Sequence, residues 1–153
     1  MKHYQRVLLF LGVNFLALGL GSLLQGEGPD GAWYQALNKA PWTPPGWVFG
    51  AAWTIVMICF SFFVATWCKV EKRKKIILFF SMQFILNVIW NMIFFKFHMI
   101  ALALAVIVAL TLLITYFFIR YAKEMKANAI LIVPYFIWLC IATSLNAYVF
   151  LNN

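Results

Sequence analysis

The sequence predicts an all-α fold: an integral membrane bundle of five transmembrane helices with a long ordered first loop, in a single domain over residues 1–153. Three observations support this prediction. Of the 153 residues, 65% are hydrophobic and only 10% are charged, whereas soluble domains are about half apolar and about one quarter charged. Five apolar runs are each long enough to cross about 30 Å of hydrocarbon as a helix. The runs also lack the alternating pattern of a membrane β-barrel strand.

The five runs are separated by short polar or turn-forming segments. The first follows a basic start that also resembles a secretory signal, but its length and its small residues favour a retained span. Only residues 96–99 join the third and fourth runs, which therefore form a tight antiparallel hairpin. The predicted spans lie near 7–25, 46–68, 76–95, 100–119 and 130–150.

The positive charges predict the orientation. Of the 12 Lys and Arg residues, ten lie in the N-terminal tail and in the segments 69–75 and 120–129, all on one side of the predicted bundle. Cytoplasmic loops carry an excess of Lys and Arg, so we expect the N-terminus inside and the first loop and C-terminus outside. The charges flank apolar runs, which indicates contact with anionic lipid and excludes a nucleic-acid face. The short basic start, without an evident transit peptide, favours a bacterial cell membrane.

The connection over residues 26–45 is unusually long and aromatic. A loop of this length in a compact bundle is usually functional or disordered. Disorder is disfavoured because Trp33, Tyr34 and Trp42 offer a large apolar area to bury. We therefore expect an ordered lid on the outer face, with its path set by Lys39, Pro41, Pro44 and Pro45.

A polar stripe runs along the third span. Gln83, Asn87 and Asn91 are spaced four residues apart, with Trp90 beside them, so they share one helix face. Amides in hydrocarbon are costly without partners, and the stripe should therefore face the bundle interior. There it either bonds to other spans or offers a polar handle to a ligand.

The fifth span carries a second stripe. Pro134, Trp138, Ala142 and Asn146 recur at four-residue steps, and the alanine leaves a notch between larger neighbours. The notch suits either another helix or a flat ligand.

The fourth span carries small residues instead. Ala101, Ala105 and Ala109 form a ladder that allows close approach, either within the bundle or between two copies. This ladder motivates the hypothesis of a homodimer.

Side chains for acid–base or metal chemistry are scarce. No Asp or Glu lies inside a predicted span, and His3 and His98 lie at the membrane margins. We therefore expect no catalytic triad, no metal site and no required cofactor. The absence of an intramembrane carboxylate also argues against a proton-coupled pump.

Three segments together resemble a known family. They are "WYQALNKAPWTPPGWVFGAAWT" in and after the first loop, "LNVIWNMIFF" at 86–95 and "PYFIWLCIATSLNAYVFLNN" at 134–153. These resemble the signature of the TspO/MBR family, also called the tryptophan-rich sensory protein or translocator protein family. The resemblance covers nearly the whole chain.

The resemblance implies a ligand-binding function. Family members are five-helix bundles, usually homodimers, that bind porphyrins such as protoporphyrin IX beneath the first loop. They also bind isoquinoline carboxamide and benzodiazepine-type ligands or cholesterol. Sterol binding is a weak expectation here, because the fifth span ends without the Lys or Arg of the sterol pattern. Carried over by motif, the binding positions are Trp33, Tyr34, Trp42, Trp53, Asn87, Trp90, Trp138 and Ala142.

Three functions remain open at this point. The first is a receptor or sensor that binds porphyrin. The second is an enzyme for light- and oxygen-dependent porphyrin degradation, as associated with some bacterial members. In that case Trp53 and Trp138 would have a redox role. The porphyrin, which is a ligand for a receptor, would here be the substrate, and it would also act as its own photosensitiser. The third is a transporter of porphyrin or sterol-like molecules.

This chain departs from the family pattern in the first loop: the family commonly has Lys-Pro where this chain has Lys39-Ala40-Pro41.

Overall fold

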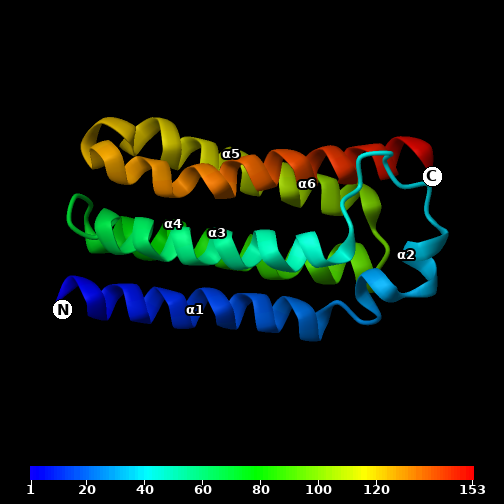
Figure 1. The fold of residues 1–153 in the computed structure, drawn as a ribbon, viewed down its shortest axis with the longest axis horizontal. Coiled ribbons are helices and arrows are strands. Elements are labelled where there is room, and N and C mark those ends of the chain that lie inside the picture. Colours follow the sequence, from blue (N-terminus) through cyan, green and yellow to red (C-terminus); the bar gives the residue numbers. More distant parts are fainter.

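The computed structural model describes all 153 residues, and it is helical throughout without any strand. Five long helices lie side by side along one direction (Figure 1). They are α1 (His3–Leu24), α3 (Gly46–Trp67), α4 (Arg73–Asn91), α5 (Ile100–Met125) and α6 (Val133–Asn152). The short elements between them are η1 (Gly28–Asp30), α2 (Ala32–Ala36), η2 (Met92–Lys96) and η3 (Lys126–Ile132). The predicted all-α class is confirmed.

Four helical segments are long and apolar enough to cross a membrane. They are His3–Asp30, Gly46–Trp67, Arg73–Lys96 and Ile100–Asn152. The last segment has 53 residues, far more than the about 20 residues that one crossing needs. It consists of α5, η3 and α6, and α6 folds back along α5 (Figure 1).

One predicted boundary is wrong. The sequence placed the end of the fourth span at residue 119 and a loop over 120–129, but α5 continues to Met125 and η3 leads directly into α6. The extension is favoured by good helix formers and by an ion pair between Arg120 and Glu124 at i, i+4. The α-helix ends where Lys126 takes a positive φ of 52°. The charged segment is therefore helical.

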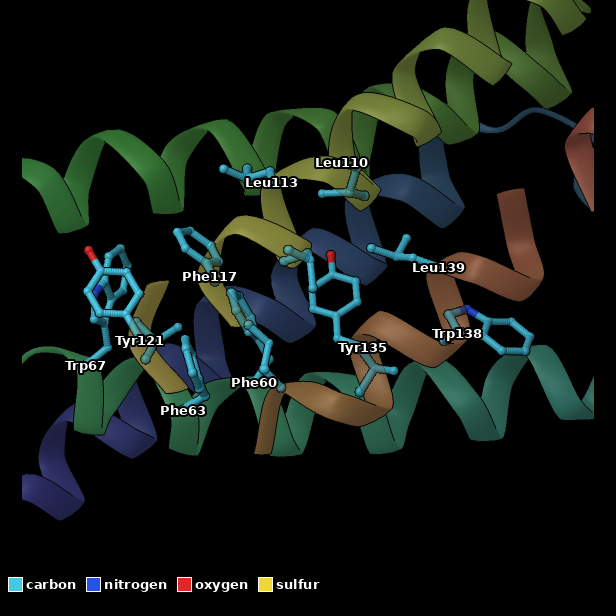
Figure 2. Packing of buried hydrophobic residues seen from close by; sticks show 14 of the residues in the cluster. Phe60, Phe63, Trp67, Leu110, Leu113, Phe117, Tyr121, Tyr135, Trp138 and Leu139 are labelled. Carbon is cyan, nitrogen blue, oxygen red and sulfur yellow. The ribbon is translucent and has the colours of Figure 1, made fainter. Parts of the chain in front are cut away.

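The centre of the bundle is built from aromatic side chains (Figure 2). Phe60 of α3 lies edge-on to Tyr135 of α6, with ring centroids 5.1 Å apart. Trp67 of α3 packs edge-on against Tyr121 of α5 at 5.3 Å, and its ring is tilted against that of Phe117 at 5.0 Å. Within lipid, helices gain little from leaving the apolar solvent, so this close packing is what holds α3, α5 and α6 together.

Helix α1 is attached to the bundle through two close contacts. Asn14 donates a buried hydrogen bond from Nδ2 to Ser61 Oγ of α3, at 2.8 Å. Near its other end, a Cβ atom on Gly21 would lie only 2.8 Å from Nδ2 of Asn91 on α4. A glycine at this position therefore leaves room for the Asn91 side chain between α1 and α4.

Glu71 fastens the turn between α3 and α4 to α5. Its Oε2 accepts hydrogen bonds from the Tyr121 hydroxyl and from Lys75 Nζ, the latter at 3.0 Å. Its Oε1 accepts the backbone N–H of Lys72 at 2.9 Å. The bond from Tyr121, followed by those from Lys72 and Lys75, lowers the pKa of Glu71 to about 2.

This low pKa predicts how the stability depends on pH. Because the pKa is lower in the folded protein than its ordinary value of 4.5, the carboxylate stabilises the fold fully above pH 4.5, and this stabilisation is lost as the pH falls toward about 2. We expect Glu71→Gln to lower the melting temperature in detergent at pH 6, with a smaller difference from the parent at pH 3. Glu124→Gln, which removes an exposed ion pair, is the control. If the melting temperature of Glu71→Gln differs from that of the parent by the same amount at pH 6 and pH 3, the prediction is wrong.

Candidate functional site

The first loop, residues 25–45, covers the end of the bundle that holds the C-terminus (Figure 1). A small cavity lies beneath this loop. This loop cavity has a volume of about 40 Å³. Its walls come from the loop, from α3, from the end of α4 with η2, and from α6. The lining residues are Tyr34, Lys39, Thr43, Phe49, Trp90, Phe94, Phe95, Ala142, Leu145, Asn146 and Val149.

One wall of the loop cavity is aromatic. Trp90 and Phe94 stack with ring centroids 5.4 Å apart and planes 13° apart. Tyr34 of α2 meets Phe95 edge-on at 5.3 Å and Phe94 at 6.1 Å. The stacked pair offers flat apolar faces, the surface on which a flat aromatic ligand would pack.

The sequence analysis did not single out Phe94 and Phe95, although Phe94 lies four residues after Trp90 and therefore on the same helix face. Consecutive residues on an α-helix point about 100° apart. Here η2 is a π-helical turn, in which the Phe97 N–H bonds to Met92 O at 3.0 Å and one extra residue is accommodated. Both phenylalanines line the loop cavity. The only sequence signal was their position four and five residues after Trp90.

The opposite wall is the notch predicted on the last span. Ala142 and Asn146 both line the loop cavity, and Trp90 Nε1 donates to Asn146 Oδ1 at 3.1 Å. Asn146 Nδ2 also donates to Ile100 O at 3.4 Å. These bonds join α4, α5 and α6 around the cavity. The two predicted stripes therefore meet here, through Trp90 on one and Ala142 with Asn146 on the other.

Trp53 and Trp138 lie behind this wall. Their rings meet edge-on with centroids 6.3 Å apart, and Trp138 also meets Phe49 at 5.4 Å. Phe49 lines the loop cavity, whereas neither tryptophan does. Trp138 is 5% exposed, and its Nε1 has no hydrogen-bond partner. The two tryptophans form a second layer, one side chain away from the cavity.

Asn87 does not line the cavity either. Its Nδ2 donates to Tyr135 Oη at 3.3 Å, and Gln83 Nε2 donates to the same oxygen at 2.8 Å. The polar stripe of α4 therefore bonds to α6, which is the first of the two roles left open by the sequence. Tyr135 was missed because a single tyrosine hydroxyl in an apolar run has no periodicity that reveals its partners.

The first loop is fastened to the C-terminus by hydrogen bonds. The Asn38 N–H donates to Asn153 Oδ1 at 2.9 Å, and Asn38 Nδ2 donates to Asn152 O at 3.1 Å. Asn153 Nδ2 returns a bond to Asn38 O at 3.3 Å. The bonds tie the middle of the loop to the last residues of the chain, above the cavity.

Two of the predicted binding tryptophans anchor the loop and do not line its cavity. Trp33 stacks on His98, with ring centroids 4.0 Å apart and planes 12° apart. Trp42 donates from Nε1 to Ser144 Oγ at 3.1 Å and lies edge-on to Tyr148. Trp33 thus holds the loop to the turn before α5, and Trp42 holds it to the outer side of α6.

The prolines set the path of the loop around Trp42. The Thr43 N–H donates to Ala40 O at 2.9 Å, which closes a β-turn with Pro41 at its second position. The proline in its shifted place therefore suits the turn that forms. Pro44 and Pro45 immediately precede α3, and Pro45 is the residue before its first turn.

Lys39 places a positive charge at the cavity. Its Nζ donates to Gln35 Oε1 at 3.1 Å and lies 4.9 Å from the ring centroid of Tyr34. The two ion pairs of the structure both lie elsewhere, so no carboxylate neutralises this ammonium.

The alanine ladder does not line the cavity. Its residues Ala101, Ala105 and Ala109 are exposed on α5.

Comparison with known proteins shows the family of the chain. The model of the TspO/MBR family matches residues 8–151. The chain belongs to the TspO/MBR family. This confirms the resemblance found in the sequence, and together with the four membrane-crossing segments it identifies the TspO/MBR chain as an integral membrane protein.

The relatives of this TspO/MBR chain include bacterial proteins and a human protein. A tryptophan-rich sensory protein of Cereibacter sphaeroides is 34% identical over 126 residues, which cover 82% of this chain and 77% of the relative. The protein CrtK of Rhodobacter capsulatus is 29% identical over 150 residues, covering 95% and 94%. The translocator protein of Homo sapiens is 27% identical over 126 residues, covering 79% and 75%.

Proposed function

We propose that the chain crosses the membrane five times, with its N-terminus in the cytoplasm and the first loop and C-terminus outside. The return of α6 along α5 supports two crossings within the 53-residue segment. The basic segments at one end of the bundle support the orientation, because the cytoplasmic side attracts Lys and Arg. The first loop then forms an outer lid over the loop cavity.

We propose that the protein is a receptor or sensor-type protein that binds a porphyrin, protoporphyrin IX, under this lid. The observation that carries the proposal is the aromatic wall of Trp90 and Phe94 facing the Ala142 notch, with Lys39 at its edge. A flat macrocycle would stack on the aromatic pair and occupy the notch. The Lys39 ammonium would meet a propionate, because no protein carboxylate neutralises it.

Binding requires the lid to move. The loop cavity holds about 40 Å³, whereas pockets for drug-sized ligands measure about 300–1,000 Å³. Enlargement must come from the loop, since the other walls are transmembrane helices packed against one another. The hydrogen bonds that resist this movement are those of Asn38 to the C-terminus and of Trp42 to Ser144.

Isoquinoline carboxamide and benzodiazepine-type ligands would pack on the same aromatic wall. A sterol has no acidic group to pair with Lys39, so it would lack this ionic contact.

The proposal is tested by titrating the purified protein with protoporphyrin IX in the dark. We expect saturable quenching of tryptophan fluorescence and a shifted porphyrin absorbance, with one porphyrin per chain. Heat-denatured protein and Lys39→Gln are the comparisons, and the variant should bind more weakly. Quenching that does not saturate, or that is the same with denatured protein, would exclude a specific site.

The second layer of tryptophans supports a further step, degradation of the bound porphyrin in light and air. The light-excited porphyrin would take one electron from Trp53 or Trp138, and oxygen would then add to the reduced ring. The oxidised tryptophan would take its electron back from this adduct, so the net reaction is the addition of oxygen to the porphyrin ring. We expect Trp53→Phe and Trp138→Phe to keep most of the dark affinity but to slow the light-driven loss of porphyrin absorbance severalfold. Trp47→Phe, which changes an exposed tryptophan of the same helix α3, is the matched control. If both variants degrade the porphyrin at the parent rate, the tryptophans have no chemical role.

We also propose that two copies associate through the alanine ladder of α5. The ladder is exposed in the single chain and allows close helix contact. We expect Ala105→Leu and Ala109→Leu to shift the protein in detergent from dimer to monomer, measured by size-exclusion chromatography with light scattering. Ala51→Leu, on an exposed face of α3, should leave the dimer intact. A dimer that survives both α5 substitutions would place the interface elsewhere.

A further inference from the structure

A second and much larger hollow lies at the opposite end of the bundle, near the start of the chain. The N-terminus marks that end in Figure 1. It is a groove of about 540 Å³ between the start of α1, the end of α3 and the start of α4. The loop cavity, at about 40 Å³, is small beside it. The family resemblance and the proposed porphyrin site do not account for this groove, which we call the arginine groove.

The arginine groove has an apolar floor and a basic mouth. Leu9 and Phe10 of α1 face Ile77 and Phe80 of α4 across the floor. Leu9 is 50% exposed and Ile77 is 55% exposed, so these side chains are open to the surroundings of the bundle. Arg6 of α1 and Arg73 of α4, among other residues, line the same groove.

Neither arginine has a partner of opposite charge. The two ion pairs of the structure are Lys75 with Glu71 and Arg120 with Glu124. Glu71 also lines the groove, but its two oxygens are occupied by Tyr121, Lys75 and the Lys72 N–H. Its charge is therefore directed toward α5, and the two guanidinium groups remain without an anion.

The N-terminal ends of α4 and α1 add positive charge near the two arginines, which favours the binding of an anion. Helix α4 begins at Arg73, with Lys72, Lys74 and Lys75 beside it and no acidic residue in its first turn. The first turn of α1 also lacks an acidic residue. The N-terminal end of a helix carries partial positive charge, so these basic residues lie where cations are least favourable. An anion at the mouth would relieve the repulsion.

We propose that the arginine groove binds one anionic phospholipid. The phosphate lies between Arg6 and Arg73, whose planar guanidinium groups suit a phosphate. An acyl chain lies along the floor between Leu9 and Ile77. The lipid joins α1 to α4 at the end of the bundle where no buried polar bond does so. This site is distinct from the general attraction of a basic loop to a membrane, because it depends on two arginines and on an open floor.

The proposal is tested by native mass spectrometry of the full chain in non-ionic detergent. The probes are dioleoylphosphatidylglycerol and dioleoylphosphatidylcholine, which differ in the net charge of the head group. We expect one phosphatidylglycerol per chain, bound at least about tenfold more tightly than phosphatidylcholine, given about 1 kcal/mol for each basic residue near an anionic lipid. The double variant Arg6→Gln/Arg73→Gln should lose this preference.

A charge-matched control separates a site from diffuse attraction. Lys123→Gln/Lys126→Gln removes the same charge from exposed positions at the end of α5, outside the arginine groove. This variant should keep the parent preference within about twofold, because screened charges outside a site contribute little. Equal loss in the lysine and arginine variants, or equal binding of the two lipids by the parent, would overturn the proposal.

A further pair of variants tests the floor. Ser81 lines the arginine groove and is exposed, so Ser81→Trp should obstruct the acyl chain and weaken phosphatidylglycerol binding without a change of charge. Leu78→Trp, at an exposed position of α4 outside the groove, should not. Melting temperatures verify that each variant is folded. Displacement of the lipid by free glycerol phosphate at equal concentration would show that phosphate alone is bound and would overturn the role of the floor.

Discussion

Replacing Ala142 with leucine is expected to weaken the binding of protoporphyrin IX by about tenfold to hundredfold in the dark titration. Ala142 is 7% exposed and lines the loop cavity on α6. A leucine there would fill the notch opposite Trp90 and Phe94. The porphyrin would then have to displace a packed side chain, and such overpacking typically costs about 1–3 kcal/mol. The effect should be large because the opposite helical wall, with Trp90 and Phe94, is bulky and a movement of the loop does not reopen the notch on α6.

The control for this substitution is Ala51→Leu, which adds the same three carbons to an exposed position of α3. It should leave the porphyrin affinity within about twofold of the parent, since exposed substitutions away from special features have small effects. The helical content and melting temperature of Ala142→Leu must be measured beside the affinity, so that a loss of binding is not a loss of folding. A folded Ala142→Leu protein with parent affinity would mean that the porphyrin binds elsewhere.

Replacing Tyr135 with phenylalanine is expected to destabilise the bundle by about 1–3 kcal/mol. Tyr135 is fully buried, and its hydroxyl accepts hydrogen bonds from Gln83 Nε2 and Asn87 Nδ2. Phenylalanine preserves the ring that packs against Phe60 but removes the acceptor shared by the two amides. Both donors would then lie in an apolar interior without this partner, which is the costly situation for a polar group.

The matched control is Tyr116→Phe, because Tyr116 is 38% exposed and its hydroxyl makes no hydrogen bond within the protein. Thermal unfolding in detergent should show a clear drop in melting temperature for Tyr135→Phe and almost none for Tyr116→Phe. Equal melting temperatures for Tyr135→Phe and the parent would indicate that the amides find other partners. The double variant Tyr135→Phe/Gln83→Leu should recover part of the loss, since it removes one of the two orphaned amides.

Much of the fold could be read from the sequence, because a membrane span is a local property. Runs of apolar residues, the short hairpin at 96–99 and the aromatic loop predicted the helices and their order. The one clear error was the end of α5. Hydropathy falls at Arg120, but the helix continues to Met125, since backbone hydrogen bonds and the Arg120–Glu124 pair do not require apolar residues.

The candidate site was predicted only in part. Of the positions carried over from the family resemblance, Tyr34, Trp90 and Ala142 line the loop cavity, and so does Lys39 of the predicted lid. Trp33 and Trp42 instead anchor the loop, and Trp53, Asn87 and Trp138 lie in a deeper layer. A motif identifies which residues a family shares, but it does not state whether each side chain touches the ligand or supports one that does.

The sequence by itself determined the membrane character, the distribution of positive charge and the family, because composition and residue order are sufficient for each. Only the tertiary structure decided which side chains meet. Phe94 and Phe95 of η2 both line the loop cavity, and the pairing of α1 with α4 leaves a groove beside Arg6 and Arg73. Both depend on how each helix is rotated about its axis, and that rotation is set by packing between segments far apart in the chain.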